Sequence, residues 1–175
     1  DHLAAAMQTL IRWEDSLGIA QAEYLYGRIL SEQGRDEEAL VQFEASKRIF
    51  AEEQDGLGVA KNLNLIAVYH FKQNRDFQTA QTCLEEALSL QRPLLVSSTS
   101  IETWRYLARV QNKNGDYLAA EVCLVEALNV SRQQEDKGEY AAALYEKLLL
   151  HKKQQQFEAA LAVGYGAHPA EILAA

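Results

Sequence analysis

Small and large apolar residues alternate with polar segments in a pattern that repeats along the whole chain. The small residues at the repeated positions are Gly27, Ala67 and Ala108; Ala39, Ala80, Ala120 and Ala160; and Ser46, Ala87, Ala127 and Ala167. The spacing within each set is 40 or 41 residues. A fixed period of this length is typical of proteins built from stacked structural units. Because small side chains let two helices approach closely, the pattern predicts tightly packed helix pairs.

Apolar residues between the polar turns recur at helical spacing, for example at Leu118, Val122, Leu124, Val125 and Leu128. Gly or Asn just past a helix end supplies a left-handed cap, and we expect the Asp that follows to cap the next helix. The helices predicted in this way span residues 3–15, 18–33, 36–53, 57–73, 76–92, 100–113, 117–134, 138–153 and 156–165.

Composition narrows the class of protein. The 175 residues are 48% hydrophobic and 24% charged, as in folded domains, and two Pro and nine Gly are too few for an all-β fold. We expect no membrane partner, because no apolar run approaches the ~18 residues of a membrane helix. A net charge of −8 argues against nucleic acid as a partner. Two cysteines form no secreted disulfide framework, so we expect a cytoplasmic protein. Since the chain begins at Asp1, we expect it to be part of a longer protein.

The third repeat carries the clearest motif, formed by Trp104, Leu107, Ala108, Gly115, Asp116, Tyr117, Ala120, Leu124 and Ala127. These residues resemble the tetratricopeptide repeat family in its forty-residue variety. The resemblance implies an all-α fold, a right-handed superhelical solenoid of antiparallel helix pairs that forms a single domain over residues 1–175. Its implied parts are a truncated leading helix at 1–15, repeats at 18–53, 57–92 and 100–134, a divergent fourth repeat at 138–167 and a tail at 168–175. The fourth repeat departs from the pattern, because Leu148 replaces a small residue and Gly164 a large one.

In this family, the first helix of each pair lines a concave groove that binds extended peptides or partner helices. The peptide-binding residues that the resemblance implies here are Tyr24, Arg28, Lys61, Asn64, Phe71, Lys72, Arg105, Tyr106, Arg109, Lys113, Tyr145 and Lys152. The complete groove-facing set also includes Lys153, Glu32, Glu102 and Glu146. It holds eight of the 17 basic residues and three of the 25 acidic residues, so the face predicts an acidic partner. Arg105 and Arg109 lie one helical turn apart and could together hold a carboxylate pair or a phosphate. The alternative is a solvated basic face whose Arg and Lys stems cover apolar surface.

Three classes of function stay open on the sequence alone. The first is a non-enzymatic scaffold that binds a protein or peptide, and the second is a regulatory sensor domain of a larger signalling or transcription-regulator protein. The third is an enzyme, for which the sequence offers no nucleophile, metal set or cofactor motif, so we expect no cofactor. A chaperone co-factor is disfavoured, because Tyr24, Leu65 and Tyr106 stand where the family's carboxylate clamp needs Lys, Asn and a basic residue.

The cysteines and two of the histidines also follow the repeat. Cys83 and Cys123 are forty residues apart at equivalent positions, and we expect structural thiols rather than a disulfide or a metal pair. His70 and His151 share another position, 81 residues apart. Because no second ligand lies at metal-binding spacing, we expect packed, hydrogen-bonded histidines rather than zinc ligands.

Overall fold

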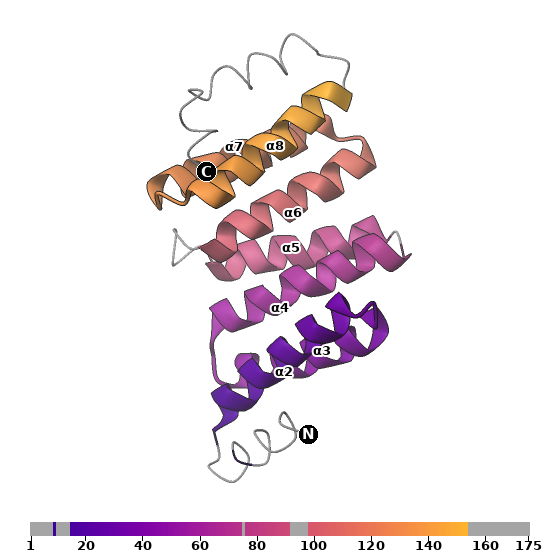
Figure 1. Ribbon diagram of the computed structural model, residues 1–175, viewed down its shortest axis with the longest axis vertical. Coiled ribbons are helices and arrows are strands. Elements are labelled where there is room, and N and C mark those ends of the chain that lie inside the picture. The colour runs from indigo at the N-terminus through magenta and orange to yellow at the C-terminus, as the bar shows by residue number, and fades with distance from the viewer. Residues whose placement is uncertain (1–8, 10–14, 75, 92–97, 154–175) are drawn as a thin grey trace. The chain divides into compact units, whose positions relative to one another are not determined.

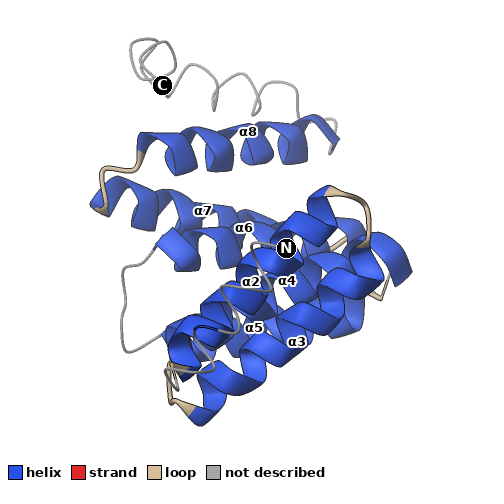
Figure 2. Ribbon diagram, turned by 60° about the horizontal axis from the view of Figure 1, so that its bottom comes forward, coloured by secondary structure: helices blue, strands red, loops and turns tan. Residues whose placement is uncertain are grey.

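The computed structural model describes Thr9 and residues 15–74, 76–91 and 98–153, and all regular structure in them is helical (Figure 2). The α-helices are α2 Ser16–Glu32, α3 Asp36–Glu52, α4 Gly56–Tyr69, α5 Phe77–Gln91, α6 Ser98–Asn114, α7 Tyr117–Gln133 and α8 Lys137–Lys153, with a π-helix η1 at His70–Asn74. The predicted all-α fold is therefore confirmed. Of the predicted helix at 3–15 only Thr9 and Asp15 are described, and Asp15 is the N-cap of α2 rather than the last residue of a preceding helix. The predicted helix at 156–165 lies outside the described residues.

The chain forms two compact units, residues 1–90 and 91–175. In the first unit α2 packs against α3, and α3 packs against α4 (Figure 1). In the second unit α6 packs against α7, α7 packs against α8, and α6 also contacts α8. The pairs α2–α3, α4–α5 and α6–α7 coincide to within two residues with the ranges expected for the first three repeats. None of the helices in the described ranges combines the length and the apolar character needed to cross a membrane.

The repeated small residues of the described helices lie in the buried interior of the helix pairs. Ala39, Ala80 and Ala120 are all buried. In the first unit, Ala39 belongs to a core cluster with Leu30, Phe43 and Ile66. The sequence period thus marks the buried side of each second helix, where a larger side chain would hold the neighbouring helix away.

Helix α7 buries a different side from the one that its largest apolar residues suggest. Its buried residues are Ala120, Cys123, Leu124, Ala127 and Ser131. Leu118, Val122 and Val125, by contrast, are exposed, and 78% of the Leu118 surface remains open. The apolar spacing correctly predicted a helix, but it did not separate the buried side that carries Leu124 from the exposed side that carries Leu118.

Several of the described loops use the expected caps, but Asp36 does not. Gly34 and Gly115 have φ values of 75° and 86°, the left-handed conformation predicted after α2 and α6. The Asp116 carboxylate accepts the Ala119 N–H at 3.0 Å and so caps α7. Asp36, however, is the first residue of α3 rather than its cap, and its carboxylate accepts a hydrogen bond from Ser31 Oγ at 3.1 Å. Asp36 lies three residues before the buried Ala39, whereas Asp116 lies four residues before the buried Ala120. Asp36 therefore falls inside the first turn of its helix rather than at the cap position.

The π-helix η1 accounts for the unequal repeat lengths. Twelve positions separate Gly27 from Ala39, and twelve separate Ala108 from Ala120. Thirteen separate Ala67 from Ala80, the pair that flanks His70–Asn74. Because a π-turn accommodates one residue more than an α-turn, η1 takes up the extra residue of the second repeat.

A buried polar network joins three helices of the first unit. Asn62 Nδ2 donates to Ser46 Oγ at 3.0 Å and to the Gly58 carbonyl at 2.9 Å. Ser46 Oγ in turn donates to the Ala20 carbonyl at 2.8 Å. Since both polar side chains are fully buried, the bonds fix the register of α2, α3 and α4 against one another.

Gly58→Ala is expected to destabilise the protein relative to Gly138→Ala. A Cβ at position 58 would overlap the Phe50 ring, whereas at position 138 its nearest neighbour would be Asp136 Oδ1 at 3.5 Å. Both glycines lie in the first turn of a helix, so the gain in helix propensity is common to the two variants. Their difference in free energy of unfolding should be about 1–3 kcal/mol, measured by urea denaturation. Equal stabilities would mean that the ring moves aside without cost.

Candidate functional site

In the first unit, two of the predicted binding residues lie together on α2. Tyr24 is half-buried, and its ring centroid lies 6.3 Å from that of Phe43 on α3. The exposed guanidinium of Arg28 lies 6.0 Å from the Tyr24 ring. Packing therefore holds the tyrosine, and the tyrosine in turn supports the arginine by a cation–π contact.

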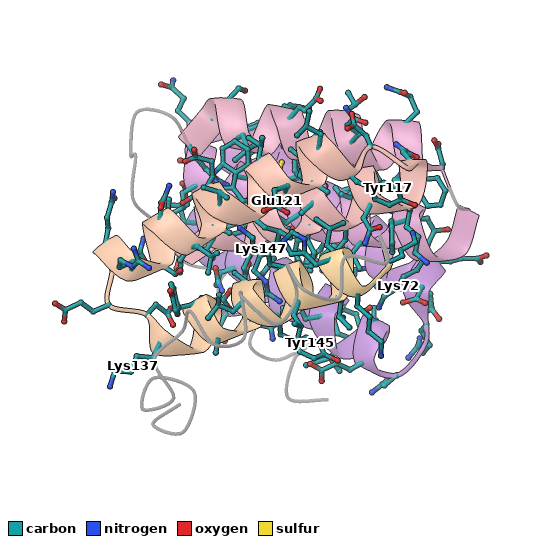
Figure 3. The ribbon with its side chains drawn as sticks, turned by 90° about the horizontal axis from the view of Figure 1, so that it is seen from above. Lys72, Tyr117, Glu121, Lys137, Tyr145 and Lys147 are labelled. Carbon is teal, nitrogen blue, oxygen red and sulfur yellow. The ribbon has the colours of Figure 1, made fainter. Side chains whose placement is uncertain are left out.

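The other predicted residues of this unit differ in exposure. Asn64 is only 1% exposed, so it belongs to the interior of the unit rather than to a ligand-binding surface. Lys61 is half-buried, and Phe71 of η1 packs against Phe77 with 5.6 Å between ring centroids. Lys72 is exposed (Figure 3). Position 64 is buried because α4 contributes most of its circumference to packing.

In the second unit, the predicted residues lie on two neighbouring helices. We define the α6–α8 face as Tyr106, Arg109 and Lys113 of α6 with Tyr145, Leu149 and Lys152 of α8. Residues three, four and seven apart share one side of a helix, so each trio forms a stripe. Tyr145 is 61% exposed and Leu149 43% exposed. The face thus presents apolar surface beside basic side chains.

Arg105 holds α6 to α8. Its Nη1 donates to Glu139 Oε2 at 2.6 Å, and its Nη2 and Nε donate to Glu146 Oε1 at 2.8 and 3.2 Å. Burial works against the charged form of Arg105, but the carboxylates of Glu146 and Glu139 outweigh it and raise the pKa of the guanidinium. Arg105 is therefore engaged within the protein, and of the predicted pair with Arg109 only Arg109 belongs to the α6–α8 face.

Tyr106 and Arg109 form the central part of the α6 stripe. The Arg109 guanidinium lies 6.0 Å from the centroid of the Tyr106 ring, and Arg109 is exposed. Burial raises the pKa of the Tyr106 hydroxyl, with a smaller contribution from nearby Glu102. Tyr106 is therefore a neutral phenol at physiological pH, and it supplies contact area rather than charge.

The C-terminal ends of α6 and α8 are also joined. Lys153 Nζ donates to the Asn112 carbonyl at 3.2 Å and to Asn112 Oδ1 at 3.1 Å, and it lies 5.3 Å from the Tyr117 ring centroid. Lys113 follows Asn112 in the sequence and Lys152 precedes Lys153, and both lysines are exposed. Basic side chains therefore gather where both helices end.

The opposite side of α8 is fixed to α7. Lys147 Nζ lies 2.8 Å from Glu121 Oε1, and His151 Nε2 lies 3.2 Å from Glu121 Oε2. Figure 3 shows Tyr145 on the side of α8 away from Glu121 and Lys147. Tyr145 is thus directed outward because the other side of α8 is occupied by these contacts.

The remaining predicted groups take structural positions. Cys123 is buried, with Sγ 3.0 Å from Gln111 Oε1, and burial raises the pKa of the half-buried Cys83 thiol. His70 packs edge-on against Tyr69 with 5.4 Å between ring centroids. Within the described ranges, no three His, Cys, Asp or Glu residues gather closely enough to hold a metal ion.

Sequence reasoning missed the role of Glu139 and Glu146. Both lie about one repeat after Arg105 in the sequence, 34 and 41 residues further on. That spacing was the available signal, because residues one repeat apart on first helices become neighbours when the helices lie side by side.

The described residues form an all-helical fold of the helical-repeat solenoid type. Neither a family model nor a curated protein matches the chain. Among solved structures, the chain is similar to the crystal structure of BtubC (BKLC) from P. vanneervenii, with a TM-score of 0.74 and 22% identity. The match covers 85% of this chain and 61% of that one, so the chain spans about three fifths of that protein's length. The likeness supports the fold class.

Proposed function

We propose that the chain is a non-enzymatic, tetratricopeptide-type scaffold that binds an acidic segment of a partner protein on the exposed sides of its first helices. The α6–α8 face carries the proposal: it combines exposed Tyr145 and Leu149 with Arg109, Lys113 and Lys152 in a chain of net charge −8. Apolar surface beside charge opposite to that of the ligand is the usual composition of a protein-binding surface. The free cysteines Cys83 and Cys123 fit a cytoplasmic location.

The proposed contacts have different roles. Tyr145 and Leu149 supply area that loses water on binding. The exposed basic groups attract the ligand over a distance of ~8 Å at physiological salt and set which charge is accepted. Binding should therefore weaken as salt is raised, while an apolar contribution persists.

The test is fluorescence anisotropy with a labelled peptide rich in Glu that contains one Leu and one Phe. We expect the variant Arg109→Glu with Lys113→Glu to lose at least about tenfold in affinity, which corresponds to ~1.4 kcal/mol. The matched control is Arg48→Glu with Arg35→Glu, which changes the net charge equally at exposed residues of the first unit, outside the face. Equal loss in both variants would show that only the overall charge matters and would refute the proposed site.

A further inference from the structure

The α6–α8 face has a polarity along its length. Arg105 of α6 contacts Glu139 and Glu146 of α8, and Asn112 contacts Lys153, so the two helices lie alongside each other in the same direction. Their C-terminal ends carry the basic side chains Arg109, Lys113, Lys152 and Lys153. Towards the N-terminal ends lie Glu102 and Glu139 together with Lys137 and Arg105, so this region carries little net charge. The most exposed apolar side chains of the face, Tyr145 and Leu149, lie between these two regions.

We propose that the α6–α8 face binds its partner segment in one orientation, with acidic side chains at the C-terminal ends of α6 and α8 and a large apolar side chain beside Tyr145 and Leu149. This inference rests on the proposed function and specifies its ligand. The occupant is a segment of another protein in which an acidic cluster stands next to an apolar residue.

Helix geometry sets the spacing within that segment. Tyr145 and Lys152 are seven residues apart, as are Tyr106 and Lys113, which is ~10 Å along a helix axis. An extended chain covers this distance in about three residues. The acidic cluster of the ligand should therefore begin about three positions from its large apolar residue.

The carboxylates of the site oppose the reverse orientation. An acidic cluster placed over the N-terminal ends would approach Glu102, which is exposed, and Glu139, whose carboxylate is already paired with Arg105. Glu102 repels an acidic ligand there and offsets the attraction of Lys137, whereas the basic side chains at the other end only attract. Arg105 does not enter the ligand contact; it is a positioning residue that keeps the two stripes side by side.

Photo-crosslinking reads the orientation directly. Two probe peptides share one sequence, a Glu cluster about three positions from a Phe and a Leu, and carry a benzophenone at the acidic end or at the opposite end. We expect the acidic-end probe to link to residues 109–113 and 149–153, and the other probe to residues 98–102 and 137–142, as mapped by mass spectrometry. Repeating the pair with the peptide sequence reversed should place the acidic end at the same residues.

A pair of charge reversals supplies the matched control. Lys152→Glu and Arg48→Glu make the same charge change, the first at an exposed residue of the α6–α8 face and the second at an exposed residue of α3. Lys152→Glu should weaken binding several-fold and Arg48→Glu should leave it nearly unchanged. Acidic-end links at 98–102 and 137–142, or at both ends equally, would overturn the orientation while leaving the proposed function standing. Absence of saturable binding by either probe would overturn the proposed function itself.

Discussion

Arg105→Glu is expected to destabilise the second unit by about 3 kcal/mol, because it replaces the centre of a partly buried ion-pair network with a third carboxylate. The Arg105 side chain is only 20% exposed, and the carboxylates of Glu139 and Glu146 would lose the guanidinium that neutralises them. Urea denaturation followed by circular dichroism measures the loss. Hydrogen exchange should show it first in α8, residues 137–153, since this helix is held by the network.

The matched control is Arg109→Glu, one helical turn further along α6. Arg109 is exposed and contacts the Tyr106 ring, so reversing its charge should cost less than about 1 kcal/mol. The pair thus separates a folding role from a binding role: Arg105→Glu is less stable, whereas Arg109→Glu stays folded and loses ligand. Equal stability of the two variants would contradict the structural role of the network.

Asn62→Asp is expected to cost about 3–5 kcal/mol at neutral pH, because it buries a carboxylate among hydrogen-bond acceptors. Asn62 donates to the Gly58 carbonyl and to Ser46 Oγ, and an ionised Asp has no hydrogen to donate. Burial would raise the pKa of the new carboxyl in the folded state above its unfolded value. The folded state then binds the proton more tightly than the unfolded state does. The loss of stability should therefore shrink as pH falls through that raised pKa.

Asn129→Asp is the control for this prediction. Asn129 is exposed on α7, and the same change there should leave the free energy of unfolding within about 0.5 kcal/mol of the original. Both variants are compared by urea denaturation at neutral and mildly acidic pH. A deficit at position 62 that does not vary with pH would mean that the lost hydrogen bonds to Ser46 and Gly58, not a buried charge, cause it.

The sequence predicted the helices well because each repeat contributes the same information again. Ala39, Ala80 and Ala120 mark close contacts that small residues alone allow, and the intervening turns carry Gly34 and Gly115 in the conformation expected of them. The pattern of a single helix would not have defined its ends or its packing residues so clearly. Even so, the side on which α7 presents Leu118 could not be read from apolar spacing, because burial depends on the neighbouring helices.

The candidate site was less predictable than the fold. The family resemblance assigned the candidate residues to the first helices, yet it did not distinguish exposed Arg109 from Arg105, which pairs with two carboxylates, or from buried Asn64. Such differences depend on which side chains reach across from the next helix, and a pattern within one helix does not contain that information. The parallel direction of α6 and α8 likewise follows from the contact between Lys153 and Asn112, which no pattern within one helix indicates.

The π-helix at His70–Asn74 bears on how a repeat array of this kind can change during evolution. One residue inserted into a regular α-helix rotates every later side chain by ~100° about the axis and would turn the packing side outward. Confining the extra residue to a single wide turn lets Ala80 occupy the same buried position as Ala39 and Ala120. Repeats in such an array can therefore gain a residue individually, and adjoining repeats need no compensating substitutions.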